Sequence, residues 1–134
     1  MSQAIQQTVK TILVVEDYED TRSMLRRFLE IKGYRVVEGA NGEEALAVAM
    51  SERPDLILMD LQMPVLDGFM ATRLIREFEH LGDVPVVAVT AHETRGVDFR
   101  NNVDELGLGR IEYLDKPVDF DRLESLLQRL LRAT

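Results

Sequence analysis

Residues 55–64 read Asp-Leu-Ile-Leu-Met-Asp-Leu-Gln-Met-Pro, an apolar run that ends in an acid. A run this short and this apolar is typical of a strand that is buried on both faces of a parallel sheet. We expect the strand over 55–59, which places Asp60 directly after its last residue. Apolar runs of the same kind alternate with helical periodicity on both sides of this stretch, so it indicates the type of fold.

Four further apolar runs predict strands, and these lie over 11–15, 34–38, 84–89 and 111–114. Helical spacing of apolar residues predicts five helices between and after the strands. They are expected around 24–31, from Asn41 to just before Pro54, and over 64–78, 98–106 and 120–131. Five strands alternating with five helices predict right-handed βαβ units. The fold class is therefore α/β, one domain with a parallel sheet covered by helices on both faces.

Two of the helices carry more detailed expectations. Asn41 is expected to cap the amide of Glu44, and the Glu44 side chain to reach back, as in a capping box. In the third helix, the residues expected to face inward are Met70, Leu74, Ile75 and Phe78.

The composition is that of one soluble globular domain of 134 residues, with 46% hydrophobic and 30% charged residues. Cysteine is absent, which excludes disulfides and thiolate metal sites and suits the cytoplasm. The first ten residues are polar, and no apolar stretch approaches the length of a membrane span. The formal net charge of −8 opposes direct binding to nucleic acid.

The residues that follow the strands carry the chemistry. The first strand is followed by Glu16 and Asp17, the third by Asp60, the fourth by Thr90, and the fifth, one residue on, by Lys116. Ligands of open α/β sheets bind outside the carboxyl ends of the strands. We therefore expect three carboxylates, one hydroxyl and one ammonium group to converge on one edge of the sheet.

Carboxylates crowded in this way repel one another unless a cation neutralises them. Oxygen ligands without imidazole or thiolate favour a hard cation, for which Mg²⁺ is the natural candidate and Mn²⁺ the alternative. A carboxylate beside the metal can then act as a nucleophile towards phosphorus. Lys116 and Thr90 fit the stabilisation of the transferred phosphoryl group.

Four motifs together resemble the signature of stand-alone, chemotaxis-regulator-like receiver domains of two-component response regulators. They are Val14-Val15-Glu16-Asp17, Leu58-Met59-Asp60-Leu61-Gln62-Met63-Pro64 with Asp67-Gly68, Val89-Thr90-Ala91, and Tyr113-Leu114-Asp115-Lys116-Pro117. The resemblance covers nearly all of the chain beyond residue 10, so residues 11–134 are expected to form the receiver domain and 1–10 an N-terminal extension. It implies a flavodoxin-like sheet of strand order 2-1-3-4-5.

The resemblance also implies roles for particular residues. Asp60 would be the phosphoacceptor, and Glu16, Asp17 and Asp60 would hold the metal together with the backbone carbonyl of Gln62. Thr90 would contact the phosphoryl group and Lys116 would pair with it. Such a protein is a switch rather than a conventional enzyme: it catalyses its own phosphorylation and its own slow dephosphorylation.

Four further positions would serve the switch itself. Tyr113 matches the aromatic residue that turns inward when Thr90 moves, although plain core packing explains a tyrosine there equally well. Pro117 is expected to follow a cis peptide bond. Gln62 and His92 would tune the rate of dephosphorylation.

The implied partners are a histidine kinase or a histidine phosphotransfer protein, and a downstream protein target. The last helix ends with the sequence, so the signal is expected to pass by protein binding or by phosphoryl relay. A homodimer through the face of the fourth and fifth helices is a further expectation. However, Thr90 and Lys116 are separated by several more residues than is usual in the family, so the fourth-helix surface is expected to depart from the standard one.

Two other functions compete with the switch. A phosphatase of the haloacid-dehalogenase type also uses a strand-end aspartate and Mg²⁺, but its Asp-x-Asp arrangement is missing, because Gln62 stands where the second acid would be. A degenerate receiver would bind partners without phosphorylation, but such modules usually lose one of the five positions that this chain retains. The alternative for Glu16 and Asp17 is that they are acids at the start of the first helix, where they favour the helix dipole.

Overall fold

The computed structural model describes residues 9–63, 67–90 and 109–132. Its strands are β1 (Thr11–Val15), β2 (Arg35–Gly39), β3 (Leu56–Asp60), β4 (Val86–Thr90) and β5 (Ile111–Asp115). Its helices are α1 (Glu19–Ile31), α2 (Gly42–Glu52), α3 (Gly68–Arg76), the 3-10 turn η2 (Glu79–Leu81) and α5 (Phe120–Leu130). The five strands form one parallel sheet in the order β2-β1-β3-β4-β5, which confirms the expected flavodoxin-like topology.

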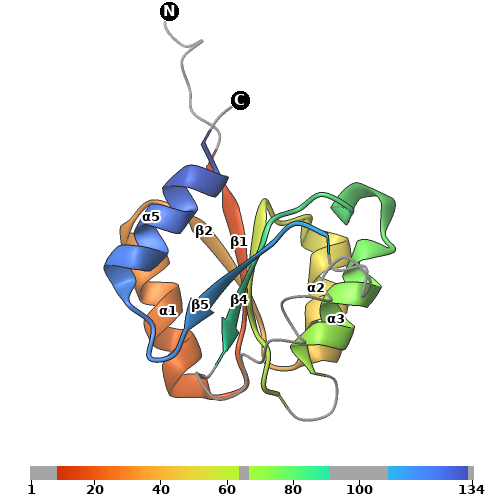
Figure 1. Cartoon of the computed structure of the whole chain (residues 1–134), viewed down its shortest axis with the longest axis horizontal. Coiled ribbons are helices and arrows are strands. Elements are labelled where there is room, and N and C mark those ends of the chain that lie inside the picture. Colours follow the sequence, from red (N-terminus) through yellow and green to blue (C-terminus); the bar gives the residue numbers. More distant parts are fainter. Residues whose placement is uncertain (1–8, 64–66, 91–108, 133–134) are drawn as a thin grey trace, which may run out of the picture.

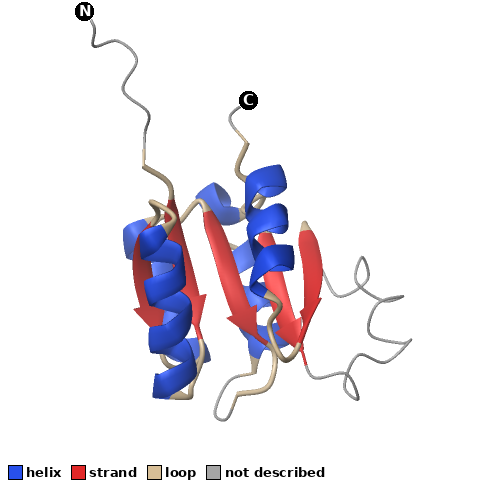
Figure 2. Ribbon diagram, turned by 90° about the vertical axis from the view of Figure 1, so that its left-hand side faces the viewer, coloured by secondary structure: helices blue, strands red, loops and turns tan. Residues whose placement is uncertain are grey.

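The helices cover the sheet on both faces. Figure 1 shows α1 and α5 on one face of the sheet and α2 and α3 on the other, and Figure 2 shows the strands running in one direction between these two layers. The helix expected around 98–106 lies outside the described residues. Among the helices within those residues, none has the length and apolar character that crossing a bilayer requires.

The central strands explain why the sequence carries such continuous apolar runs. Every residue of β1, β3 and β4 is buried, and successive side chains enter different cores. Ile12 and Leu58 pack in the core under α1 and α5, whereas Leu13 and Met59 pack in the core under α2 and α3. A strand with a core on each face needs apolar residues at every position.

The start of α2 follows the expected capping pattern with one difference. The amide of Glu44 donates to the Asn41 side chain over 2.9 Å. The Glu44 carboxylate accepts from the amide of Ala40 over 2.7 Å, one residue before the cap itself. Both ends of the reciprocal pair are therefore present, and they fix where the chain leaves β2 for α2.

The third helix is shorter than the sequence suggested. It begins at Gly68 and ends at Arg76, so only part of the expected range 64–78 is helical, and residues 64–66 lie outside the described part. Ala71 and Ile75 are buried on this helix, but Met70 is 41% exposed, so the inward orientation expected for Met70 is wrong. With the helix starting at Gly68, its buried face falls one residue beyond Met70.

In the first helix, too, the spacing of apolar residues does not tell which of them are buried. Leu25 and Leu29 are buried against the sheet. Met24 and Ile31 share their helical periodicity in the sequence, yet they are 48% and 82% exposed. A spacing rule identifies the helix, but the width of its buried stripe depends on what packs over it.

Candidate functional site

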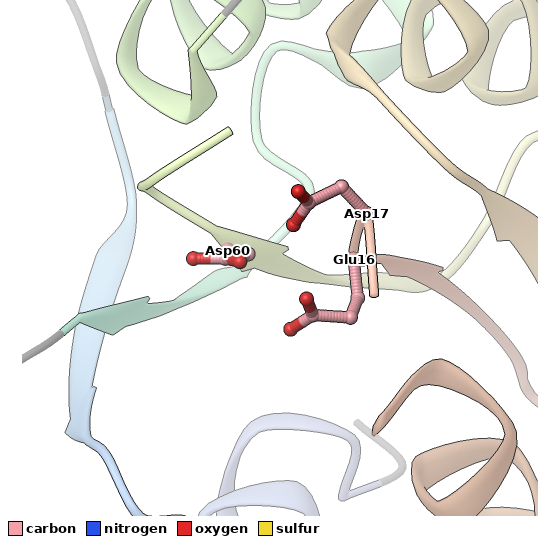
Figure 3. A group of neighbouring side chains, drawn as sticks. All are labelled: Glu16, Asp17 and Asp60. Atoms are coloured by element: carbon pink, nitrogen blue, oxygen red, sulfur yellow. The ribbon is translucent and has the colours of Figure 1, made fainter. Parts of the chain in front are cut away.

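Three carboxylates meet at the carboxyl edge of the sheet, as expected. Glu16 and Asp17 follow β1, and Asp60 is the last residue of β3. The register pairs Val15 with Met59, so the strand ends lie side by side. One carboxylate oxygen from each of the three residues lies within 4.8 Å of those of the other two. Figure 3 shows the three side chains gathered at these neighbouring strand ends.

Glu16 is held by its main chain and by its side chain. It is 6% exposed, and its amide donates to the carbonyl of Gly39 on β2 over 3.1 Å. Its Oε2 accepts from the amide of Tyr18 over 3.0 Å. Asp17, the next residue, is exposed. The pair thus combines one buried carboxylate of fixed position with one that faces solvent.

Burial raises the pKa of Glu16 to about 7, and the negative charge of Asp60 acts in the same direction. The hydrogen bond from the Tyr18 amide and the charge of Lys116 lower this pKa, but they do not offset the burial. The site therefore disfavours the ionised form of Glu16, mainly through burial and to a smaller extent through the charge of Asp60. A bound cation would favour the ionised form.

This raised pKa predicts how stability without metal depends on pH. Because the pKa of Glu16 is about 7 in the folded chain and has its ordinary value of 4.5 in the unfolded chain, folding takes up a proton between these values. The stabilisation is complete below the lower value and is lost as pH rises through the upper one. We expect unfolding free energies measured in EDTA to fall by on the order of 2 kcal/mol from about pH 5 to about pH 8, relative to a Glu16→Gln variant.

Denaturant titrations of the two proteins across this pH range provide the measurement. The Glu16→Gln comparison removes the contributions of all other titrating groups. An identical pH dependence in wild type and variant would contradict the raised pKa. Added Mg²⁺ should abolish the difference if it binds the ionised carboxylate.

Asp60 is 3% exposed and is held through one oxygen. Its Oδ1 accepts from the amide of Gln62 over 2.9 Å and lies 3.1 Å from Nζ of Lys116. The amide of Lys116 donates to the carbonyl of Thr90 over 2.9 Å, which ties the end of β5 to the end of β4. The peptide bond between Lys116 and Pro117 is cis, as expected. The ammonium group of Lys116 therefore lies beside Asp60 at the sheet edge, in line with the expected convergence of these groups.

These residues open into a cleft of about 580 Å³ between α1 and the segment that joins β5 to α5. The cleft is lined by polar and by apolar side chains; the polar ones include Glu16, Asp17, Asp60, Gln62 and Lys116, and the apolar ones include Met24, Leu25, Pro117, Val118 and Phe120. Gln62 is exposed at this cleft. A small charged ligand can therefore reach the acids from solvent.

Thr90 and Tyr113 lie near the site but deeper in the fold. Thr90 is 1% exposed at the end of β4, opposite Asp115 of β5 in the register. Tyr113 is half-buried and packs against the core under α2 and α3. Neither is among the described residues that line the cleft. His92 lies outside the described residues, so its predicted tuning role stays a prediction.

Gly68, at the start of α3, packs closely against the end of β3 beside the site, which the sequence did not predict. A Cβ on Gly68 would overlap the carbonyl oxygen of Asp60 and would lie 2.8 Å from Cα of Leu61. The Asp67 side chain, one residue earlier, caps the amide of Met70 over 2.9 Å. The Asp-Gly pair before an apolar stretch signals a helix start, but the close packing of this start on the end of β3 needs the tertiary structure.

The chain is thus a parallel α/β domain with an acidic pocket at the carboxyl edge of its sheet, and the pocket is of the kind that can hold a metal ion. The sequence profile of the response regulator receiver domain family matches residues 12–128. The chain belongs to this family. It is a receiver domain of the two-component type, whose function is phosphoacceptor signalling.

Curated relatives agree with this family. The polar-differentiation response regulator DivK of Brucella anthropi is 35% identical over 123 residues, which make up 91% of this chain and 96% of that protein. A probable transcriptional regulator of Cyanophora paradoxa is 37% identical over 93% of this chain. The match spans 49% of that longer protein.

Solved structures with the same fold include two of particular interest. The receiver domain of a sensor histidine kinase from Pseudomonas aeruginosa, with a magnesium ion coordinated in its active site cleft, superposes with a TM-score of 0.81. It is 38% identical and covers 94% of this chain and 100% of its own. The chemotaxis protein CheY4 of Vibrio cholerae superposes with a TM-score of 0.83 at 29% identity, over 92% of this chain and 99% of its own.

Proposed function

We propose that this receiver domain is a Mg²⁺-dependent switch in which Asp60 accepts a phosphoryl group from a phosphohistidine. The receiver itself spans residues 11–134, and residues 1–10 are an extension. The observation that carries the assignment is the position of Asp60. It is the buried acid at the end of β3 that Lys116 contacts, and it faces the acids that follow β1.

The donor set fits a hard divalent cation. All three side chains supply carboxylate oxygens, and the pKa of Glu16 is raised because burial and Asp60 disfavour its charge. Glu16, Asp17 and Asp60 would hold Mg²⁺ or Mn²⁺, with the backbone carbonyl of Gln62 as a further ligand. The Pseudomonas receiver domain, with magnesium in its cleft, supports this choice. When bound, the metal would neutralise charge on the site and on the phosphoryl oxygens.

The residues of the chain account for the transfer itself. A carboxylate oxygen of Asp60 forms a bond to phosphorus as the bond from phosphorus to the donor's imidazole nitrogen breaks, and that nitrogen keeps the electron pair. Lys116 stabilises the negative charge of the phosphoryl group, since its ammonium already lies at Asp60. Asp60 is only 3% exposed, which limits the access of bulk water to the acyl phosphate.

Phosphorylation would place nearly two negative charges at the end of β3. We assign Thr90 as the hydroxyl that moves to these charges and Tyr113 as the aromatic residue that follows it. Thr90 is well placed for this role, because it ends β4, the strand that pairs with β3. Gln62 and His92 would set how long the phosphoryl group persists.

The partners follow from the chemistry. The phosphodonor is a histidine kinase or a phosphotransfer protein. The output is a protein bound by the altered surface, or a homodimer through the face of the fourth and fifth helices. The net charge of −8 argues against direct contact with nucleic acid, and the absence of cysteine is consistent with a cytoplasmic location. The chain acts as a switch with slow self-dephosphorylation rather than as a conventional enzyme.

The cation site is tested by an Asp17→Asn variant. Asp17 is exposed, so the change should leave the fold intact while it removes one anionic ligand. We expect the dissociation constant for Mn²⁺, measured by electron paramagnetic resonance with Mg²⁺ as competitor, to rise at least roughly tenfold. Asp20→Asn is the matched control, because Asp20 is an exposed acid in the first turn of α1 outside the three-residue cluster. Equal binding by both variants would contradict the assignment of Asp17.

A further inference from the structure

Arg22 reaches from α1 back to the main chain of the acidic pair. Its Nη1 donates to the carbonyl oxygen of Glu16 over 2.9 Å. That carbonyl belongs to the peptide that joins Glu16 to Asp17, so the contact is made to the main chain between two of the proposed ligands. The Arg22 side chain is 17% exposed, and its amide donates to Tyr18 in the first turn of α1. It is therefore a largely covered arginine on a well-anchored part of the helix.

The same guanidinium is fixed at its other edge by β2. Its Nε lies 3.0 Å from Oε1 of Glu38. Glu38 precedes Gly39, whose carbonyl accepts from the amide of Glu16. The main chain of Glu16 is thus held from both sides, by β2 at its amide and by Arg22 at its carbonyl. A guanidinium has donors in a rigid fork, so it can serve a carbonyl and a carboxylate together in a fixed geometry.

The contact of Arg22 matters because Asp17 lies in a short connection, where its orientation depends on the Glu16–Asp17 peptide. The side chain of Asp17 is exposed, and the residue stands in the short connection between β1 and α1. The next residue, Tyr18, caps α1 without a side-chain hydrogen bond. Rotation of the Glu16–Asp17 peptide would swing the two carboxylates relative to each other. A contact to the carbonyl of this peptide restrains that rotation.

We propose that Arg22 is a positioning residue of the cation site, which acts by fixing the Glu16–Asp17 peptide so that both carboxylates face the same cation. The inference rests on the proposed function, since it concerns the same site. It does not make Arg22 a ligand. Arg22 is positively charged, as the metal is, so it cannot bind the metal. Glu38 pairs with the guanidinium at its far edge.

The charge of Arg22 and its positioning role predict opposite effects on metal affinity when the residue is removed. If Arg22 acted only through its charge, its removal would take a cation away from the metal site and so strengthen metal binding. If it acts through position, its removal weakens metal binding in spite of the more favourable charge. The sign of the change in affinity therefore separates the two roles.

The test measures Mn²⁺ dissociation constants for wild type, Arg22→Ala and Arg22→Lys, well below the thermal midpoint of each protein. We expect Arg22→Ala to weaken binding roughly tenfold, the usual size for residues that orient metal ligands. Arg22→Lys keeps the charge but lacks the fork, so it should also bind several-fold more weakly. Because this second variant is the milder one, it preserves the test if Arg22→Ala does not fold.

Arg26→Ala is the matched control. Arg26 lies on the same helix and pairs with the same Glu38 at 3.3 Å, but its other described contact is to Glu30 rather than to Glu16. Its removal should change Mn²⁺ affinity by less than about twofold, since it orients no ligand. Unchanged or tighter binding in both Arg22 variants, or an equal loss in Arg26→Ala, would overturn the proposal. Failure of the wild type to bind Mn²⁺ would instead overturn the proposed cation site itself.

Discussion

An Asp60→Asn variant is expected to gain no phosphoryl group when it is incubated with acetyl phosphate and Mg²⁺, whereas the wild-type chain becomes phosphorylated. An amide is a poor nucleophile towards phosphorus, and it forms no acyl phosphate. The substitution keeps the shape of the side chain and an oxygen that can accept the hydrogen bond from the Gln62 amide. The fold should therefore survive, and the loss should be complete rather than partial. Intact-protein mass spectrometry of the two proteins measures this difference.

A matched variant controls for the removal of an acid as such. Glu19 is an exposed acid in the first turn of α1, close in sequence to the cluster but outside it. Glu19→Gln should be phosphorylated to the same extent as wild type. If Asp60→Asn accepts as much phosphoryl group as Glu19→Gln, another residue is the acceptor.

The second large effect concerns Gly68, where α3 begins. A Gly68→Ala variant is expected to lose roughly 2–3 kcal/mol of unfolding free energy, because its Cβ would overlap the main chain of Asp60, which ends β3, and of Leu61, which follows it. The two nearest atoms are backbone, so movement of the Leu61 side chain alone would not make room. Relief requires α3 and the end of β3 to separate, which would also displace Asp60. Urea unfolding measures the first effect, and the rate of phosphorylation measures the second.

Gly82 provides the comparison for this substitution. Its Cβ would meet nothing nearer than the carbonyl oxygen of Glu79 at 3.7 Å, an ordinary contact. Its φ of −61° suits alanine. Gly82→Ala should therefore change stability by less than about 0.5 kcal/mol, or raise it slightly by restricting the unfolded chain. Equal stability of the two variants would show that α3 is free to move off β3.

The sequence predicted the strands well for a physical reason. Successive residues such as Leu58 and Met59 of β3 pack in different cores, so a central strand of the sheet must be apolar at nearly every position. That pattern is short, continuous and easy to recognise. Because parallel strands deliver their last residues to one edge, the convergence of Glu16, Asp17 and Asp60 could also be foreseen. The strand order itself came from the family resemblance rather than from periodicity.

Other features depend on tertiary contacts that periodicity does not encode. The exposure of Met70 follows from the point at which Asp67 and Gly68 start α3, and the close packing of Gly68 depends on how that helix meets β3. The contact of Arg22 with the carbonyl of Glu16 joins a helix to a strand end through a main-chain atom. Every residue has a main-chain carbonyl, so the sequence does not indicate which carbonyl a side chain will contact.

The location of the phosphoryl group tests most directly whether Asp60 is the phosphoacceptor. Wild-type protein would be phosphorylated with acetyl phosphate and Mg²⁺, reduced with borohydride to trap the acyl phosphate as a stable alcohol, and digested for peptide mass spectrometry. The proposed function predicts that the reduced residue is Asp60 and that the peptide containing Glu16 and Asp17 is unmodified. Reduction at Asp17, at any other acid, or at no residue would contradict it.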